Sequence, residues 1–242
     1  MNAKDKHTIY TLLKTADAYE CGYTREKFAG EPDFTDVIER KTEAEMPGSS
    51  PSMTNGLSLD ELNAKILRCT RCGLARTRNN VVPGMGVEHP EVLVIGEGPG
   101  HDEDMQGLPF VGKAGVLLDR MLVAIGLDRK TNCYIANIVK CRPPQNRDPL
   151  PDEQATCNAF LQAQIHILKP KMILCMGRIS GHKMLDTQEP LNKLRGQIFE
   201  YNGIPLMVTY HPSALLRDES LKAPAWQDLK LFRDKLAAIK NS

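Results

Sequence analysis

No stretch of this 242-residue chain stays apolar for the ~20 residues that a membrane-spanning helix needs. The first ten residues carry Lys4, Asp5 and Lys6 without a long apolar core after them, so we expect no secretory signal. Hydrophobic residues make up 41% and charged residues 25%, which is typical of a soluble globular protein. These features favour an intracellular, cytoplasmic protein whose thiols stay reduced.

Net charge is also close to zero, at +1, which alone neither favours nor excludes a nucleic-acid partner. Its distribution along the chain is more informative. Residues 1–58 hold seven Lys or Arg and ten Asp or Glu, a balance of −3, which leaves +4 for the remainder. A mildly basic remainder weakly favours a polyanionic partner.

The composition divides the chain into two regions. Residues 1–57 have modest apolar content and end in a Pro/Gly/Ser linker, 46–56, so we interpret them as a weakly ordered extension. A small helical subdomain, with short helices near residues 10–13 and 37–38, is the alternative. Residues 58–242 are expected to form the folded domain.

Strands that alternate with helices in residues 58–242 predict an α/β fold, with helices on both faces of a mostly parallel sheet. We expect a small sheet of four core strands. The core strands are predicted at 92–95, 132–139, 172–176 and 206–209, a candidate edge strand at 198–201, and helices at 58–68, 113–125, 152–168, 179–185 and 225–239.

One stretch, Glu91–Gly112, combines several features of a ligand site. A short apolar strand runs into the glycine-rich turn Gly96–Gly100, which lets backbone N–H groups approach a ligand closely. Three acids and the pair Pro109-Phe110 follow. Since open α/β sheets bind ligands at the carboxyl ends of their strands, we expect a site here. An ordinary strand-to-loop connection is the alternative.

Four of the seven cysteines are candidate metal ligands. Cys69 and Cys72 form a C-x-x-C motif at the end of a predicted helix, and Cys141 and Cys157 follow in a loop and at a helix start. Four thiolates bind zinc or an iron–sulfur cluster, and spacing does not distinguish the two. A redox C-x-x-C normally lies between a strand and a helix, which is not its placement here. The others are interpreted as core residues of predicted strands or as part of the extension: Cys133, Cys175 and Cys21.

Four motifs occur in a characteristic order: Cys69–Cys72, Gly96–Phe110, Asn137–Arg147 and His211–Arg217. Together they resemble the family 4 uracil-DNA glycosylases, the iron–sulfur branch of that superfamily, from about residue 60 to the C-terminus. The resemblance implies an α/β/α sandwich. It also implies hydrolysis of the N-glycosidic bond of deoxyuridine in DNA, which releases uracil and leaves an abasic site.

The resemblance further implies a cofactor and a location. It places a [4Fe–4S] cluster on Cys69, Cys72, Cys141 and Cys157. The expected partner is uracil-containing DNA, single- or double-stranded, bound by a monomer associated with the nucleoid and not with a membrane.

Two departures from the family pattern lie beside the expected pocket. Family members often have a run of acids after the turn, where this chain has His101 followed by three acids, and Leu108 stands where many members have Arg before Pro-Phe. A related iron–sulfur branch binds uracil-DNA covalently through a His in an inserted basic loop. Residues 142–149 contain neither His nor an insertion, so a covalent reaction is disfavoured.

Three residues are expected to handle the base. The uracil must be flipped out of the helix into a pocket, where Phe110 is the stacking platform. Asn137 carries a donor and an acceptor that match uracil O4 and N3–H. His211, next to Pro212 after a strand, is expected to stabilise the negative charge that develops on O2 of the leaving uracil. The alternatives are a core Phe, a strand-end cap and a loop His with a structural hydrogen bond.

Other groups complete the expected site. The turn residues Glu97, Gly98, Pro99 and Gly100 are expected to bind uracil, with help from backbone N–H groups of the turn, of which Pro99 has none. Glu103 is the candidate, by resemblance, for stabilising the cationic sugar and orienting water; Asp102 and Asp104 are alternates, and a solvated acidic loop is the other reading. The residues expected to contact DNA, through phosphates or as a wedge, are Lys113, Arg142, Arg147, Leu215, Leu216 and Arg217.

The sequence is also compatible with a different class of function. A module that carries a cluster or zinc and binds DNA or a repair partner without cleavage would share the cysteines. The presence of both Asn137 and His211 argues for the glycosylase instead.

Overall fold

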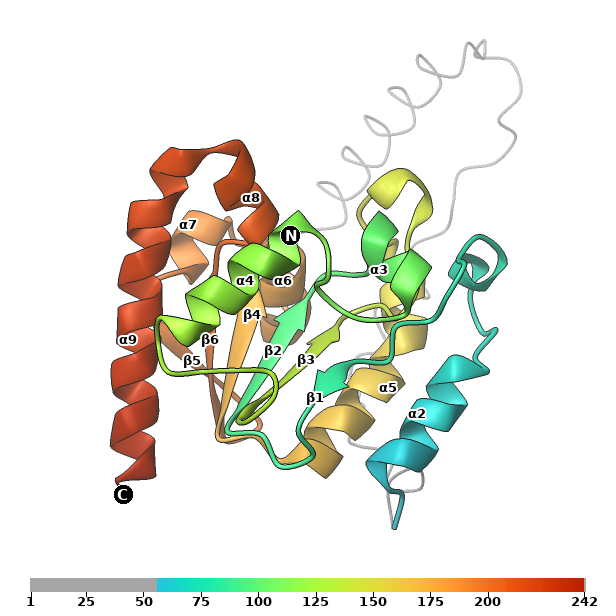
Figure 1. Cartoon of the computed structure of the whole chain (residues 1–242), viewed down its shortest axis with the longest axis horizontal. Helices are drawn as coiled ribbons and strands as arrows, with labels where there is room; N and C mark the ends of the chain where they lie inside the picture. Colours follow the sequence, from blue (N-terminus) through green and yellow to red (C-terminus); the bar gives the residue numbers. More distant parts are fainter. Residues whose placement is uncertain (1–55, 242) are drawn as a thin grey trace, which may run out of the picture. The chain divides into compact units, whose positions relative to one another are not determined.

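The described strands form one sheet in the order β1-β3-β2-β4-β6-β5 (Figure 1). The computed structural model describes residues 56–241. The central strands β3, β2, β4 and β6 are parallel, whereas β1 and β5 pair antiparallel at the two edges. The bounds are β1 (Met85–Gly86), β2 (Val92–Gly96), β3 (Cys133–Asn137), β4 (Met172–Met176), β5 (Ile198–Tyr201) and β6 (Ile204–Thr209).

The expected number of four strands was too low, since the described sheet has six. The four predicted core strands correspond to its parallel centre, and the candidate edge strand 198–201 is confirmed as β5. The sequence does not predict β1, because its two residues, Met85 and Gly86, are too few to show a periodic pattern.

The helices follow the predicted ones closely, and α2 begins with a cap at Ser58. Ser58 Oγ accepts the backbone N–H of Glu61 at 3.2 Å, and the Glu61 carboxylate accepts the N–H of Ser58 at 2.8 Å. The short helices α3 and α8 lie in segments that the sequence presents as loops. The bounds are α2 (Leu59–Leu67), α3 (His101–Gln106), α4 (Lys113–Val123), α5 (Pro151–Leu168), α6 (Arg178–Leu185), α7 (Leu191–Leu194), α8 (Pro212–Arg217) and α9 (Lys222–Lys240), with 3-10 turns η3 (Gly73–Arg76), η4 (Pro144–Asn146) and η5 (Glu219–Leu221).

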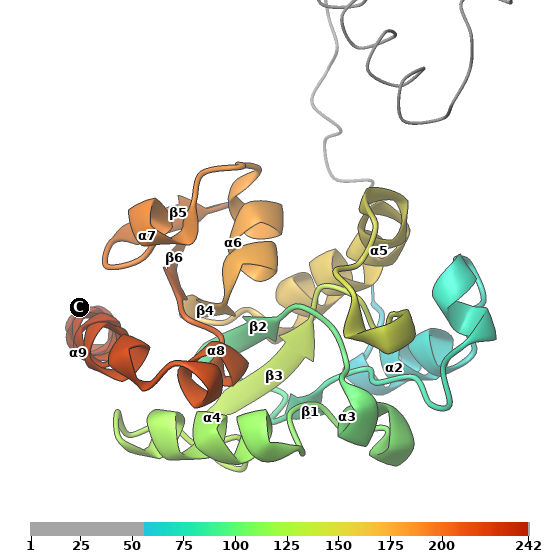
Figure 2. The same ribbon diagram turned by 90° about the horizontal axis from the view of Figure 1, so that it is seen from above.

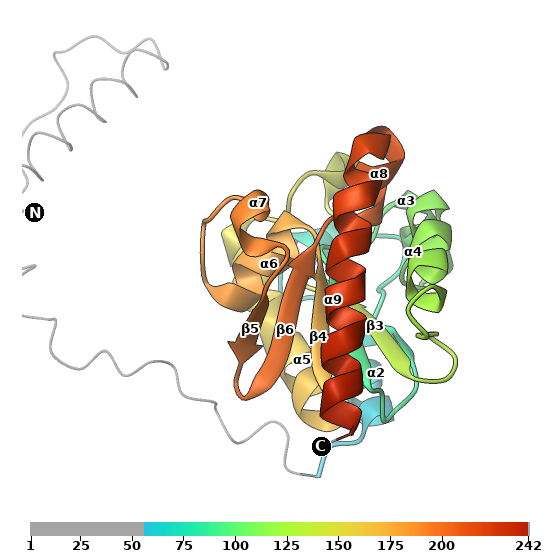
Figure 3. The same cartoon turned by 90° about the vertical axis from the view of Figure 1, so that its left-hand side faces the viewer.

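Helices cover both faces of the sheet, which confirms the α/β class (Figure 2). Successive side chains of a strand point to opposite faces, so Leu93 and Ile95 pack with α2, α5 and α6, while Val92 and Val94 pack with α4 and α9. Figure 3 shows α9 running along the sheet on the side of α4.

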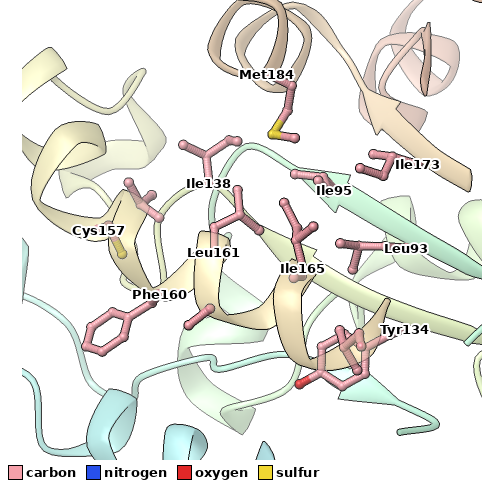
Figure 4. Packing of buried hydrophobic residues seen from close by; sticks show 14 of the residues in the cluster. Leu93, Ile95, Tyr134, Ile138, Cys157, Phe160, Leu161, Ile165, Ile173 and Met184 are labelled. Carbon is pink, nitrogen blue, oxygen red and sulfur yellow. The ribbon is translucent and has the colours of Figure 1, made fainter. Parts of the chain in front are cut away.

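The core beneath α5 is built mainly from aliphatic side chains (Figure 4). Leu161 and Ile165 of α5 lie in one cluster with Ile95 of β2 and Met184 of α6. Cys133 and Cys175 are fully buried in β3 and β4, which confirms their interpretation as core residues.

Several predictions concern residues outside the described range. They are the short helices near residues 10–13 and 37–38, the linker before Gly56, and Cys21. Among the described helices, none is both long and apolar enough to cross a membrane.

Candidate functional site

A cavity of about 510 Å³ opens at the carboxyl ends of the four parallel strands. Its walls come from residues 97–100 after β2, Asn137 at the end of β3, residues 177–179 after β4 and residues 211–214 after β6. From β2 the chain passes to β3, which lies on one side of β2 in the sheet. From β3 it crosses to β4, which lies on the other side of β2. The cavity therefore lies where an open α/β sheet changes its winding direction, the usual ligand position in such folds.

Most of the predicted pocket residues share this cavity, although they come from four separate segments of the chain. Lys113, Arg142, Leu215 and Leu216 lie outside its walls. The predicted residues that line it are Glu97, Gly98, Pro99, Gly100, Glu103, Phe110, Asn137, Arg147, His211 and Arg217.

Gly96, at the end of β2, allows two of these side chains to meet. A Cβ atom at this position would lie 2.4 Å from Asn137 Oδ1 and 2.7 Å from Phe110 Cζ. Any residue other than glycine would therefore displace the amide, the ring or both. This role was not predicted from the sequence, although the glycine at the strand end was a visible signal.

The amide of Asn137 carries an unused acceptor. The residue is 2% exposed, and its Oδ1 has no hydrogen-bond donor among the described residues. A buried polar atom without a partner costs about 1–3 kcal/mol. A ligand that brings an N–H group to this oxygen would recover that free energy.

The ring of Phe110 forms the neighbouring wall. Phe110 is 6% exposed and has a φ of 52°, a left-handed conformation that costs a non-glycine residue roughly 1–3 kcal/mol. Its ring centroid lies 5.5 Å from that of His211, with 32° between the planes.

His211 caps the short helix α8 with its own side chain. Nδ1 accepts the backbone N–H of Ser213 at 3.2 Å and lies 2.8 Å from the Ser213 hydroxyl. Since a backbone amide can only donate, Nδ1 carries no proton and the neutral ring is protonated at Nε2. Burial, together with the positive charge of Arg217, lowers the pKa of His211 to about 4. The ring is therefore a neutral donor at physiological pH.

The carboxylate of Glu103 is held by three backbone amides. Oε2 accepts from Gly100 at 3.1 Å, and Oε1 accepts from Val111 at 2.9 Å and Gly112 at 3.0 Å. It thus ties the start of α3 to the segment that carries Phe110.

The two alternate acids lie outside the cavity walls. Asp104 is 1% exposed and accepts hydrogen bonds from the backbone amides of Asn79 and Asn80. Asp102 is exposed and lies beside His101. Glu103 is therefore the acid of this run that reaches the cavity.

Glu97 is a second carboxyl group in the cavity wall. Burial, reinforced by the nearby negative charge of Asp148, raises the pKa of Glu97 to about 7, against an opposing effect of Arg178. Asp148 and Arg178 form an ion pair of 2.6 Å between the loop before α5 and the start of α6, and both line the cavity. Arg178 was not predicted as a site residue, although only Gly177 separates it from a predicted strand.

The residues expected to contact DNA differ in their exposure and in whether they are already paired with other side chains. Lys113 and Arg217 are exposed, whereas Arg147 makes a two-pronged ion pair with the buried Glu153 at 2.7 and 2.9 Å. Of the two candidate wedges, Leu215 is 2% exposed and belongs to the core, while Leu216 is 49% exposed. Leu215 cannot reach DNA from there, so Leu216 is the one available.

The four candidate metal ligands line a second, smaller cavity. Cys69 and Cys72 follow α2, Cys141 follows β3, and Cys157 lies on α5 next to Phe160 (Figure 4). Burial raises the pKa of Cys141 to about 11 and that of Cys157 in the same direction. Arg78 donates to the sulfur of Cys141 at 3.1 Å, so one cation already faces this sulfur. All four are free thiols.

Comparison with known proteins identifies the class. A family model described as "Uracil DNA glycosylase superfamily" matches residues 83–230. The chain is 38% identical to a type-4 uracil-DNA glycosylase of Archaeoglobus fulgidus, over 72% of this chain and 90% of that protein. Type-4 uracil-DNA glycosylases of Sulfurisphaera tokodaii and Thermotoga maritima are 40% and 42% identical, over 73% and 67% of this chain and 84% and 85% of theirs. The chain belongs to the uracil-DNA glycosylase superfamily, in its type-4 group.

Proposed function

We propose that this protein flips deoxyuridine out of DNA and hydrolyses its N-glycosidic bond, releasing uracil for base excision repair. The observation that carries the proposal is the buried, unpaired Oδ1 of Asn137 beside Phe110 and His211 in one cavity. An acceptor, an aromatic face and a neutral donor are the three groups that binding uracil and stabilising its anion require.

Recognition of the base rests on Asn137 and Phe110. Oδ1 of Asn137 accepts the N3–H of uracil, and the amide nitrogen donates to O4. Phe110 stacks on the face of the base, as aromatic rings do for extruded nucleotides. Cytosine presents the opposite pattern at N3 and C4, so the same amide rejects it.

Bond cleavage depends on the charge that develops on each side of the bond. As uracil leaves, negative charge grows on O2, and the Nε2–H of His211 donates to it. A low pKa keeps His211 neutral, so it stabilises the anion without first losing or gaining a proton. Residues 97–100 line the same wall, and backbone N–H groups of Glu97 and Gly98 are proposed to assist, since Pro99 has none and that of Gly100 already donates to Glu103.

The sugar side needs a carboxylate. Glu103 is proposed to stabilise the oxocarbenium-like sugar and to orient the attacking water. Its oxygens already accept three backbone N–H groups, which hold the carboxylate in a fixed position. Fixed charge of this kind suits electrostatic stabilisation of a cation better than proton transfer.

DNA is held around the cavity by groups that carry no sequence information. Lys113, Arg142 and Arg217 are proposed to bind phosphates. Leu216, exposed on α8, is proposed to fill the space that the flipped nucleotide leaves. Arg147 instead orders the loop before α5 through Glu153.

A [4Fe–4S] cluster is proposed on Cys69, Cys72, Cys141 and Cys157. Four thiols surround one cavity, which supports a site with four thiolate ligands. The resemblance to the iron–sulfur branch favours a cluster over one zinc ion. A bound cluster would join the segment after α2, the loop after β3 and helix α5, and so would support the fold. The residues that act on uracil lie in the other cavity.

A DNA-binding module without glycosylase activity is the competing function. A release assay on an oligonucleotide with a single uracil separates the two. Free uracil and an abasic site should both appear in proportion to one another. DNA binding without release of uracil would instead establish the binding module.

Domain roles follow the same division as the composition. Residues 58–242 are proposed to be the glycosylase domain, and residues 1–57 an extension that the reaction does not need. All residues of both proposed sites lie in the first of these.

A further inference from the structure

Phe110 has a left-handed backbone conformation, which is unfavourable for a phenylalanine. Its φ is 52°, and its ring lies against Gly96 at the end of β2. A side chain in this region of φ relaxes unless neighbouring groups hold it. The stacking ring therefore depends on whatever fixes the backbone of residues 109–112.

Arg129 donates hydrogen bonds to two successive carbonyl groups of that segment. Its Nη1 donates to Pro109 O at 2.9 Å and its Nη2 to Phe110 O at 3.1 Å. The side chain is 9% exposed. Arg129 lies beyond α4 in the sequence, so this contact is made by the fold and not by local turn geometry.

Asp119 of α4 sets the orientation of this guanidinium. Its Oδ1 accepts from Nε of Arg129 at 2.8 Å and from Nη2 at 2.6 Å. The planar guanidinium thus contacts one carboxylate and two carbonyl oxygens at once. A lysine ammonium, as a single point donor, cannot reproduce this arrangement.

The opposite side of the same segment is held by different groups. Glu103 accepts the N–H groups of Val111 and Gly112. On α4, a Cβ at Gly115 would lie 1.9 Å from Phe110 O, so the helix packs directly against this backbone. Arg129 is the side chain that donates to the carbonyl of Phe110 itself.

We propose that Arg129 is a positioning residue that holds the ring of Phe110 in its stacking orientation for the base. The proposal rests on the proposed uracil excision and deepens it. Without the hydrogen bonds from Arg129 to both carbonyls, φ of Phe110 can return to negative values, and the ring then leaves the cavity wall. The base then loses its stacking surface although Asn137 and His211 remain in place.

A double-mutant cycle tests the functional part. Arg129→Lys should lower kcat/KM for uracil release by about 10- to 100-fold, the range expected for losing stacking on one base. In a Phe110→Ala background the same substitution should change kcat/KM by less than about threefold, because the ring is already absent. If the fold-losses of the two single variants multiply in the double variant, Arg129 acts by another route than Phe110, and the proposal is overturned.

A second measurement needs no activity. The chain has six phenylalanines, so 4-fluorophenylalanine labelling gives a resolvable 19F NMR spectrum in which Phe110→Leu assigns the Phe110 signal. Arg129→Lys should shift or broaden this signal and leave the other phenylalanine signals in place. An unmoved Phe110 signal would overturn the proposal, even if the parent protein released no uracil and the proposed function had failed.

Arg195→Lys is the matched control for the spectrum. Arg195 also joins an aspartate, Asp228, and a backbone carbonyl, Pro224 O, but on α9. Arg195 also lies over the ring of Tyr210, next to His211, so its substitution should move the Phe110 signal clearly less than Arg129→Lys does. An equal shift in both variants would show general loosening of the fold and would also overturn the proposal.

Discussion

The ring of Phe110 lies 5.5 Å from the ring of His211, centroid to centroid, although the two follow different strands. One ring offers a face for a planar base and the other a donor for the charge that the base acquires. This pair, together with the amide of Asn137, is the centre of the predictions below.

The first prediction separates two roles of His211. Its Nδ1 caps α8, and its Nε2–H is proposed to stabilise the uracil anion. His211→Ala should lower turnover by about 10²–10³-fold, the usual cost of one oxyanion donor. His211→Asn can still cap the helix, so it should lose turnover to a similar extent but keep a melting temperature near that of the parent.

The control for His211 is DNA affinity, measured with an oligonucleotide bearing an abasic site. Both variants should bind it like the parent. If affinity and turnover fall together, His211 is a binding or folding residue and the assignment is wrong.

The second prediction tests Asn137 as the reader of the base. Asn137→Asp removes the amide donor, and its carboxylate repels uracil O4. Mispaired buried polar groups can reject a substrate by ~10⁴-fold or more, so uracil release should fall by several orders of magnitude. A trace of cytosine release should appear, stronger at low pH where the acid form is populated. Release of uracil near the parent rate would place base recognition elsewhere.

The third prediction concerns pH and Glu97. Folding raises the pKa of Glu97 from 4.5 to about 7, so the folded state holds this proton more tightly than the unfolded state. The stabilisation that comes from protonation is complete below pH 4.5 and is lost as pH rises toward 7. Glu97→Gln removes this dependence. Its melting temperature should equal that of the parent near pH 4.5 and exceed it by about 2–6 °C at pH 8.

Thermal melts of both proteins at four or five pH values would measure the difference. His211 contributes the opposite slope, because its lowered pKa makes the fold less stable as pH falls from 6.5 to about 4. His211 is present in both proteins, so its contribution cancels when the two curves are subtracted. A difference that is constant with pH would show that Glu97 titrates normally.

The fourth prediction is the metal content. Purified protein should be brown and contain about four irons per chain. Cys141→Ser should lose iron and melt at a lower temperature, since the ligands join α2, β3 and α5. Cys175→Ser is the control, because Cys175 is buried in β4 and outside the second cavity, so it should keep its iron. Colourless parent protein with one zinc would contradict the assignment.

The fifth prediction concerns residues 1–57. A chain shortened to begin at Thr54 keeps every residue of both cavities and should retain uracil release within about twofold of the full chain. Circular dichroism would verify that the shortened chain is folded. A large loss of turnover with intact folding would show that the extension takes part in catalysis or DNA binding.

The order of strands and helices, and most of their bounds, could be read from the sequence because each follows from local patterns. Apolar runs such as Val92–Ile95 and Met172–Met176, and the cap at Ser58, depend only on neighbouring residues. The motifs around Asn137 and His211 could also be recognised from their order. The two-residue strand β1 and the short helices α3 and α8 could not, because such short segments form only with tertiary support.

The tertiary structure decided how the recognised residues are used. It brings the side chains of Asn137 and Phe110 close together beside Gly96. It forms the ion pair of Arg147 with Glu153. It buries Leu215 and leaves Leu216 exposed. It also places Arg129 on the carbonyls of Pro109 and Phe110. A sequence lists which donors and acceptors exist, but burial and distance determine which of them are already paired and which remain for a substrate.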